Sequence, residues 1–233
     1  MANVLILGAS RGLGAALVAG LPRKGDTVFG LSRSEPAWLR RKSAIQRRWI
    51  EADLCELGAV QNARREIGKT PIDALIHVAG IWDEAPFEEM HDDEIAEILD
   101  VDLRAFLAFT RGLAPNLRRA DHAKIIAIGS TNGLDNGEMT AVAYASAKFG
   151  LRGACQALRQ HFRKDGIAVT CLSPGSIASD VSYGEGTALA LKKHRGKRMP
   201  VTDIVALIRC ILDLSPAACV KEIAMPALKD EDV

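Results

Sequence analysis

A glycine-rich turn close to the N-terminus, Gly8–Gly14, is the feature that most constrains the fold of this chain. It follows an apolar run, Val4–Leu7, that is typical of a buried strand, and it precedes a stretch with helical character, Ala15–Leu21. Glycines let the backbone turn sharply and approach a pyrophosphate, and the start of a helix supplies free N–H groups and a positive dipole end. The spacing is Gly-x3-Gly-x-Gly and not the commoner Gly-x-Gly-x-x-Gly, so a purely structural turn is the alternative. The residues predicted to hold a dinucleotide phosphate here are Gly8, Ser10, Arg11, Gly12, Leu13 and Gly14.

Short apolar runs and amphipathic stretches alternate along most of the chain, which is the pattern of βαβ units. Further strand signals lie at Thr27–Leu31, Ile45–Ile50, Ile72–Val78, Lys124–Ile128 and Ile167–Leu172, and long helical stretches at about 92–119 and 144–164. Such alternation predicts a parallel sheet with right-handed crossovers. No Pro-, Gly- or Ser-rich linker and no repeat interrupts it. We therefore expect one α/β domain over residues 1–233, a doubly wound Rossmann-type parallel sheet in three α/β/α layers.

The composition narrows the classes of function. Hydrophobic residues make up 48% of the 233 residues and charged residues 25%, which suits a soluble protein with a sizeable core. The net charge of +1 lacks the basic excess of a nucleic-acid-binding protein. Five widely spaced cysteines, without a Cys-x-x-Cys pair, indicate neither a disulfide framework nor a zinc site. Because no apolar run approaches the ~20 residues of a membrane span, we expect a cytoplasmic protein with no metal, nucleic-acid or membrane partner.

The end of the second predicted strand bears on the choice of cofactor. An acidic residue there binds the ribose 2′-OH of NAD, whereas a basic residue pairs with the 2′-phosphate of NADP. Arg33 and Ser34 occupy this position, no carboxylate precedes Glu35, and Arg11 in the glycine turn could reach the same phosphate. We expect NADP(H) in preference to NAD(H), with a solvated, uninvolved Arg33 as the alternative.

Asp53 and Leu54 follow the third predicted strand. An aspartate at the carboxyl end of a strand can accept a hydrogen bond from the adenine amino group, and it can also cap the next helix. The two roles are compatible, and we predict that both residues contact the cofactor.

Tyr144 and Lys148 open the second long helical stretch, and their i, i+4 spacing places both side chains on one helix face. A nearby ammonium stabilises phenolate, so such a phenol can act as an acid or base nearer neutral pH. Ser130 ends the preceding strand, from which its hydroxyl would point toward the same cleft. In isolation the Tyr-x3-Lys pair is weak evidence, because such pairs often lie on solvated faces. It gains weight from the phosphate-binding turn upstream.

These motifs, in this order, resemble the short-chain dehydrogenase/reductase family from the N-terminus to about Asp180, and more loosely beyond. The matching positions are Gly8, Gly12, Gly14, Ser130, Tyr144, Lys148 and the pair Pro174 and Gly175. The resemblance further implies that Ile177 contacts the nicotinamide through its backbone and that Ser179 approaches the cofactor.

The same resemblance implies a mechanism. Tyr144 would protonate a carbonyl oxygen during reduction or take the proton of an alcohol during oxidation. Lys148 would hold the nicotinamide ribose, and Ser130 would hydrogen-bond the oxygen of a small-molecule carbonyl or alcohol substrate. The expected activity is that of a carbonyl reductase or alcohol dehydrogenase. A cofactor-binding sensor without turnover is the alternative, whereas a nucleotide-sugar epimerase would need a longer chain.

The chain departs from the family's pattern in two places near the site. The usual Asn-Asn-Ala-Gly reads His77-Val78-Ala79-Gly80, in which Ala79 and Gly80 still let the backbone approach the cofactor and His77 is expected to be structural. Asp102 stands where the family has a catalytic asparagine. Its carboxylate would either raise the pKa of Lys148 or face a solvated groove, and we expect an altered proton relay.

The C-terminal part is the least similar to the family. A seventh strand is predicted within Cys219–Pro226, and the long helices favour a homodimer, with a tetramer as the alternative. Residues 180–200 are expected to form the substrate lid. This segment contains a run of basic residues. Such a run is usually a solvated face, and the alternative is that it recruits an anionic substrate. Four residues stand at positions where relatives have pocket walls, with ordinary packing as the alternative for each: Trp82, Asn136, Met139 and Tyr183.

Overall fold

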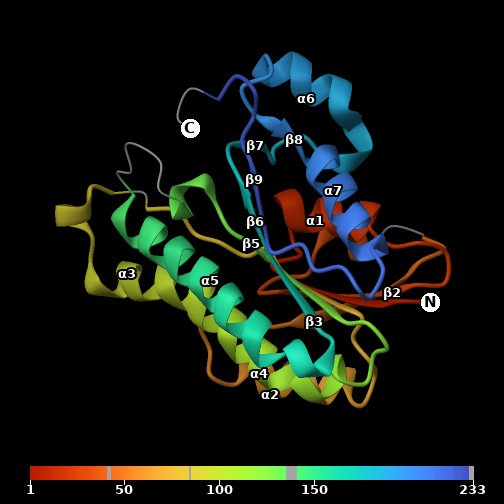
Figure 1. Ribbon diagram of the computed structural model, residues 1–233. Coiled ribbons are helices and arrows are strands. Elements are labelled where there is room, and N and C mark those ends of the chain that lie inside the picture. Colours follow the sequence, from red (N-terminus) through yellow and green to blue (C-terminus); the bar gives the residue numbers. More distant parts are fainter. Residues whose placement is uncertain (41–42, 84, 135–140, 231–233) are drawn as a thin grey trace.

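The computed structural model describes residues 1–40, 43–83, 85–134 and 141–230. Its main sheet has the strands β1 (Asn3–Leu7), β2 (Thr27–Ser32), β3 (Gln46–Glu51), β4 (Ala74–His77), β5 (Lys124–Ile128), β6 (Ala168–Pro174) and β9 (Glu222–Met225). All seven are parallel, in the order β3-β2-β1-β4-β5-β6-β9 (Figure 1). The chain thus builds one side of the sheet outward from β1 and the other side outward from β4. This reversal opens a crevice at the carboxyl edge, which is where ligands bind in doubly wound folds.

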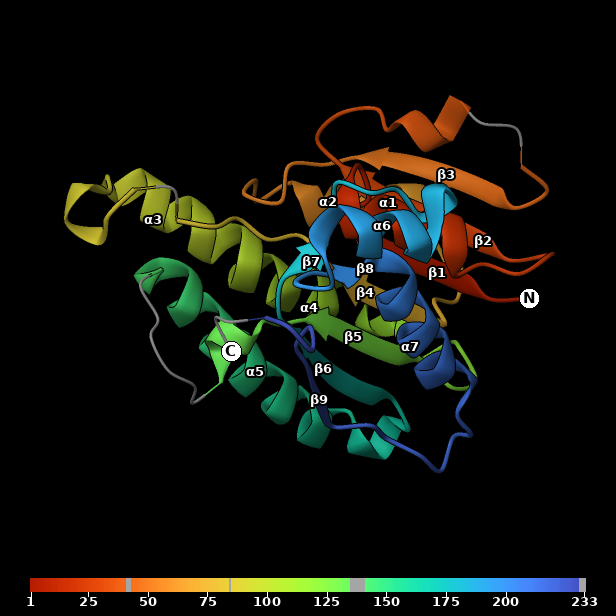
Figure 2. The same cartoon turned by 90° about the horizontal axis from the view of Figure 1, so that it is seen from above.

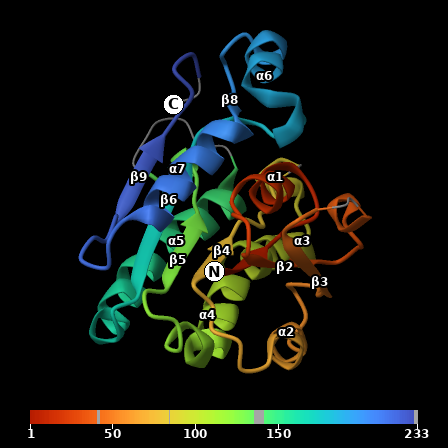
Figure 3. The same cartoon turned by 90° about the vertical axis from the view of Figure 1, so that its right-hand side faces the viewer.

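Helices cover both faces of the sheet and complete the three predicted layers (Figure 1, Figure 2). On one face α1 packs beside α7, with α6 beyond them, and on the other lie α2, α4 and α5 (Figure 3). The helices are α1 (Gly12–Gly20), α2 (Ala59–Ile67), α3 (Asp92–Leu99), α4 (Ala105–Leu117), α5 (Val142–His161), α6 (Gly186–His194) and α7 (Val201–Asp213). Within the described ranges, no helix combines the length and apolar character that a membrane crossing requires.

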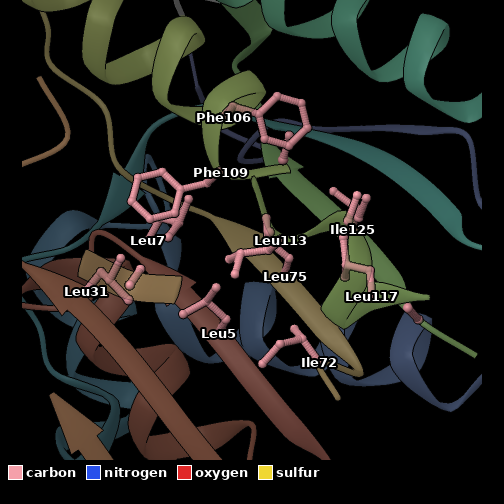
Figure 4. Close-up of a cluster of buried hydrophobic side chains, with 14 of the residues drawn as sticks. Leu5, Leu7, Leu31, Ile72, Leu75, Phe106, Phe109, Leu113, Leu117 and Ile125 are labelled. Carbon is pink, nitrogen blue, oxygen red and sulfur yellow. The ribbon is translucent and has the colours of Figure 1, made fainter. Parts of the chain in front are cut away.

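The central strand β1 shows why its sequence reads as an unbroken apolar run. Successive side chains of a strand point to opposite faces of the sheet. Leu5 and Leu7 join the apolar cluster beneath α4, where Leu7 lies beside Phe109 (Figure 4). Val4 and Ile6 join the cluster beneath α1 and α7. Both faces of β1 are therefore buried, as expected for the centre of a parallel sheet.

The connection from β2 to β3 departs most from a regular βαβ unit. Its described residues contain only a 3-10 turn, Ala37–Arg40, in place of an α-helix. Trp38 in this turn is 5% exposed, and its indole N–H donates to the carbonyl oxygen of Ala9 at 2.7 Å. The indole ring also lies so close to Gly30 that a Cβ there would be 2.6 Å from it. Trp38 thus anchors this crossover to the sheet and to the glycine turn.

The long helical stretch predicted at about 92–119 is interrupted. A π-helical turn, Asp100–Arg104, separates α3 from α4 and contains Asp102. Such turns are rare and are frequently found at functional sites. The predicted seventh strand is present as β9, which pairs with β6. A second, two-stranded sheet, β7 (Ile177–Ala178) with β8 (Met199–Pro200), has no counterpart in the sequence predictions.

Candidate active site

A cavity of about 780 Å³ lies at the carboxyl edge of the sheet. The predicted site residues that line it are Gly8, Ser10, Arg11, Leu13, Gly14, Arg33, Asp53, Leu54, Ala79, Gly80, Ser130, Tyr144, Lys148, Pro174, Gly175, Ile177 and Ser179. Three predicted residues lie outside its lining. Gly12 faces Ser179, Ser34 contributes its carbonyl oxygen to the Ser32 hydroxyl at 2.9 Å, and Asp102 is fully buried behind the wall.

The glycine turn has the geometry that a pyrophosphate needs. Gly8 adopts a φ of +91°, and a Cβ there would lie 2.7 Å from the amide nitrogen of Ala79. A Cβ on Gly14 would lie 1.9 Å from the carbonyl oxygen of Gly8. Arg11 is the N-cap of α1, and no described side chain caps this helix start, so its first-turn N–H groups can receive an anion. The residues present therefore fit the phosphates of a dinucleotide.

Arg33 directly follows β2, lines the cavity and contacts Glu97 of α3. Its Nη1 lies 3.5 Å from Oε1 of Glu97, and both side chains are largely exposed. Asp53 accepts the N–H of Cys55 at 2.9 Å, which closes a turn. Because α2 begins only at Ala59, with Gly58 as its N-cap, the second role considered for Asp53, capping the next helix, is wrong. Asp53 does line the cavity, and its contact with the adenine stays a prediction.

Ser130, Tyr144 and Lys148 share one wall of the cavity. Lys148 is 3% exposed, and its Nζ lies 5.1 Å from the centre of the Tyr144 ring and 3.1 Å from the carbonyl oxygen of Ile128. Ser130 follows β5 and accepts the N–H of Asn132 at 3.1 Å, which fixes the position of its hydroxyl oxygen. A fixed hydroxyl, a phenol and an ammonium on one wall can together bind a substrate oxygen and move a proton to or from it.

Asp102 binds directly to Lys148 behind this wall. The carboxylate is 0% exposed, its Oδ2 lies 2.9 Å from Nζ of Lys148, and its Oδ1 accepts the N–H of Ile81 at 2.8 Å. The expectation that the carboxylate approaches Lys148 is met, and the alternative in which it faces a solvated groove is wrong. Such a buried pair persists because each charge has its partner.

Burial and charge act in opposite directions on this pair. Burial raises the pKa of Asp102, and the Lys148 ammonium offsets part of that rise. Burial alone would lower the pKa of Lys148, but the negative charges of Asp102 and Tyr144 raise it above its ordinary value. Lys148 therefore stays cationic near neutral pH, and the Asp102 carboxylate balances its charge.

His77, at the end of β4, contacts the π-helical turn that holds Asp102. Its Nε2 lies 3.3 Å from the carbonyl oxygen of Asp102, its ring packs against Phe106, and Nδ1 has no hydrogen-bond partner among the described residues. Burial, reinforced by the charge of Lys148, lowers the pKa of His77 to about 3. The imidazole is thus neutral, and it makes the structural contacts that were expected of His77.

The segment 180–200 contains α6 and a cluster of ion pairs. Asp180 accepts Lys193 at 2.7 Å and His194 at 2.8 Å. The hydrogen bond from Lys193 is the main reason that the pKa of Asp180 is lowered to about 2. Part of the basic run is therefore neutralised within the segment, which favours the solvated-face alternative for Lys193 over recruitment of an anionic substrate.

The four residues considered as pocket walls do not all line the cavity. Trp82 lines the cavity, and its ring lies 4.7 Å from that of Tyr144. Tyr183 does not line it but packs against α1 and α7, where a Cβ on Gly20 would come within 2.6 Å of its ring. Tyr183 thus follows the packing alternative, because its ring lies against Gly20 and not in the cavity lining. Asn136 and Met139 lie outside the described residues.

Two acidic residues at the site are not found by sequence reasoning. Asp83 is 8% exposed and accepts the N–H groups of Ala143 and Tyr144 at 3.0 and 2.9 Å. Asp230 lines the cavity, and its Oδ2 accepts the N–H of Ser176 at 2.9 Å. Their partners are 54 to 61 residues away along the chain, so no local pattern marks either residue.

Comparison with known proteins places this site in a family context. Residues 2–188 match the family described as short chain dehydrogenase. The D-xylose 1-dehydrogenase of Caulobacter vibrioides is 29% identical over 232 residues, which cover 93% of this chain and 90% of that protein. The acetoacetyl-CoA reductase of Paracoccus denitrificans is 31% identical over 188 residues, which cover 78% of this chain and 76% of the relative.

Solved structures share the fold at low sequence identity. An alcohol dehydrogenase from the archaeon Thermococcus sibiricus, complexed with 5-hydroxy-NADP, aligns with a TM-score of 0.84 at 19% identity, covering 98% of this chain and 97% of that one. A 4-hydroxyisoleucine dehydrogenase complexed with NADH aligns with a TM-score of 0.83 at 23% identity, covering 98% of both chains. Both the doubly wound fold and the predicted family are thereby confirmed. The chain belongs to the short-chain dehydrogenases/reductases, oxidoreductases that bind nicotinamide dinucleotides and act on alcohol or carbonyl groups.

Proposed function

We propose that this protein is an NADP(H)-dependent oxidoreductase that transfers a hydride between the nicotinamide and the carbonyl or alcohol carbon of a small molecule. The observation that carries the proposal is that one cavity is lined by the glycine turn, by two arginines and by Ser130, Tyr144 and Lys148. Its volume of about 780 Å³ is in the range of cofactor and ligand sites.

The preference for NADP(H) rests on Arg11 and Arg33. Both line the cavity, and guanidinium groups match phosphate oxygens in geometry and charge. The contact of Arg33 with Glu97 is long and exposed, so it contributes little and a 2′-phosphate can replace it. Because the similar solved structures contain an NADP analogue in one case and NADH in another, the fold itself does not choose between the cofactors.

Three side chains would perform the proton chemistry. The bound cofactor supplies or accepts the hydride at C4 of its nicotinamide. Tyr144 gives its proton to the carbonyl oxygen during reduction and takes it back from the alcohol during oxidation. Ser130 orients that oxygen by a hydrogen bond, and Lys148 binds the nicotinamide ribose while its charge favours the phenolate.

The substrates named for the relatives suggest where to look first. The relatives include a D-xylose 1-dehydrogenase and an acetoacetyl-CoA reductase, so aldoses and acetoacetyl-CoA belong in a substrate panel with simple ketones, diketones and aldehydes. The purified protein would first be titrated with NADPH and NADH, and then assayed for oxidation of NADPH against each carbonyl and for reduction of NADP⁺ with each aldose. We expect NADPH to bind at least about ten-fold more tightly than NADH, because an ionic contact to phosphate is worth ~1.5–3 kcal/mol.

The Tyr144→Phe variant is the control for the chemistry. It removes the acid–base hydroxyl but keeps the ring, so NADPH affinity should stay within about two-fold while turnover falls by about 100-fold or more. Tighter binding of NADH than NADPH would contradict the cofactor proposal, and near-full activity of Tyr144→Phe would contradict the role of Tyr144. Tight NADPH binding without turnover of any substrate would instead favour a cofactor sensor.

A further inference from the structure

The N-cap residue of the helix that carries Tyr144 provides no side-chain cap. Helix α5 starts at Val142, and its N-cap residue, Ala141, has no side-chain oxygen that could accept an N–H group. The first N–H groups of any helix lack partners within the helix, and Tyr144 lies in this first turn. The N–H groups of the turn that presents the phenol to the cavity therefore need a partner other than the N-cap side chain.

Asp83 is that partner. Its two carboxylate oxygens accept the N–H groups of Ala143 and Tyr144 at 3.0 and 2.9 Å, one oxygen for each donor. Asp83 is 8% exposed, and its negative charge lies at the positive end of the dipole of α5. A buried carboxylate with two charge-assisted bonds fixes both partners strongly, because separating them would leave a buried charge unsatisfied.

The two residues before Asp83 contact the same group of side chains. Ile81 donates its N–H to Asp102, the partner of Lys148, at 2.8 Å. The ring of Trp82 lies 4.7 Å from the ring of Tyr144, at an interplanar angle of 52°. Three consecutive residues thus contact the buried ion pair, the Tyr144 ring and the Tyr144 backbone in turn. We call the segment Ile81–Asp83 the brace.

We propose that Asp83 is a positioning residue for Tyr144, and that the brace sets the place of the phenol relative to Lys148 and to the substrate oxygen. The proposal rests on the proposed function in taking Tyr144 as the acid–base group. Asp83 itself takes no part in proton transfer. Its loss would free the first turn of α5, and a small displacement of a reacting group reduces the rate far more than it reduces binding.

The test compares three variants. Asp83→Ala removes both acceptor oxygens, and Asp83→Asn keeps one. Glu94→Ala is the matched control, because Glu94 accepts the N–H of His91 at 2.7 Å at the start of α3, outside the lining of the cavity. For each variant kcat, KM and the affinity for NADPH are measured well below the melting temperature. Hydrogen exchange is followed over residues 142–148.

We expect Asp83→Ala to lower kcat by at least about ten-fold with NADPH affinity within two-fold of wild type, and to accelerate amide exchange at the start of α5. Asp83→Asn should give an intermediate kcat, and Glu94→Ala should keep the wild-type value. The proposal is overturned if Asp83→Ala keeps the wild-type kcat, or if Asp83→Ala and Glu94→Ala lower kcat equally. If Asp83→Ala does not fold, Asp83→Asn decides by the same criteria.

The design separates this inference from the proposed function. If the wild-type protein turns over no substrate, the proposed function fails, but the exchange measurement still tests whether Asp83 holds the turn of Tyr144. Unchanged exchange over residues 142–148 in Asp83→Ala would then overturn the positioning role by itself.

Discussion

At the scale of single residues, the replacement of the family's asparagine by Asp102 changes the charge around Tyr144. The carboxylate lies 2.9 Å from Lys148, and both side chains are buried, so water screens their interaction only weakly. An ammonium without this partner would present a full positive charge to the Tyr144 ring, 5.1 Å away. With Asp102 in place, much of that charge is balanced.

Asp102→Asn should therefore lower the free energy of unfolding by about 3–5 kcal/mol, because it leaves the buried Lys148 ammonium without its charged partner. The same change removes the main cause that raises the pKa of Lys148. Urea denaturation of the wild type and the variant measures this loss. This measurement needs no substrate.

The matched control is Asp213→Asn, which removes the carboxylate of the exposed Arg23–Asp213 ion pair and should change stability far less, because exposed ion pairs contribute little. Equal losses in the two variants would mean that the buried Asp102–Lys148 pair contributes no more to stability than an exposed one.

At the scale of elements, the strands could be predicted far better than the connections. Strands buried on both faces read as continuous apolar runs, and all of those predicted are present within a few residues of their expected ends. The β2–β3 crossover could not be predicted, because Trp38 holds it through contacts with Ala9 and Gly30 that no local pattern encodes. The π-helical turn Asp100–Arg104 likewise lies within a stretch that reads as plain helix.

The same distinction separates the site residues. Tyr144 and Lys148 could be identified because one helical turn relates them, and the glycine turn because its residues are contiguous. Asp83 and Asp230 could not, since each acts on backbone N–H groups more than 50 residues away. Sequence reasoning thus finds the residues proposed to carry the chemistry more readily than those proposed to hold them in place.

Trp38→Phe should lower the free energy of unfolding by about 1–3 kcal/mol, because it leaves the buried carbonyl of Ala9 without its hydrogen bond while the ring is largely kept. Since Ala9 belongs to the glycine turn, NADPH affinity should fall as well. Urea denaturation with and without NADPH measures both effects.

Trp49→Phe is the matched control for Trp38→Phe. In the wild type the indole N–H of Trp49 donates to the Ser32 hydroxyl at 3.1 Å, and Trp49 is less buried than Trp38. It should change stability by less than Trp38→Phe. Equal losses in the two variants would show that the bond to Ala9 has no special role in anchoring the crossover.

At the scale of the whole molecule, His77 connects the centre of the sheet to the helical stretch beneath the site. It ends β4, beside the crevice, and its ring contacts the π-helical turn and Phe106 of α4. Protonating it would place a charge in the interior near Lys148, which is also cationic. Because burial holds the pKa of His77 near 3 in the folded protein, against an ordinary value of 6.5, the stability of the entire fold is linked to pH through this residue.

The sign of this linkage follows from the lowered pKa. Above pH 6.5 His77 is neutral in both states and adds no pH dependence, whereas between pH 6.5 and 3 only the unfolded chain binds the proton. Stability should therefore fall as the pH drops, by about 2 kcal/mol between pH 7.5 and pH 5, since each pKa unit is worth ~1.4 kcal/mol. His77→Asn lacks the titrating group, so its urea midpoint should depend less on pH over this interval. The same loss of stability in wild type and variant would mean that His77 is protonated within the fold, and that its imidazole is less strictly excluded from water than its burial implies.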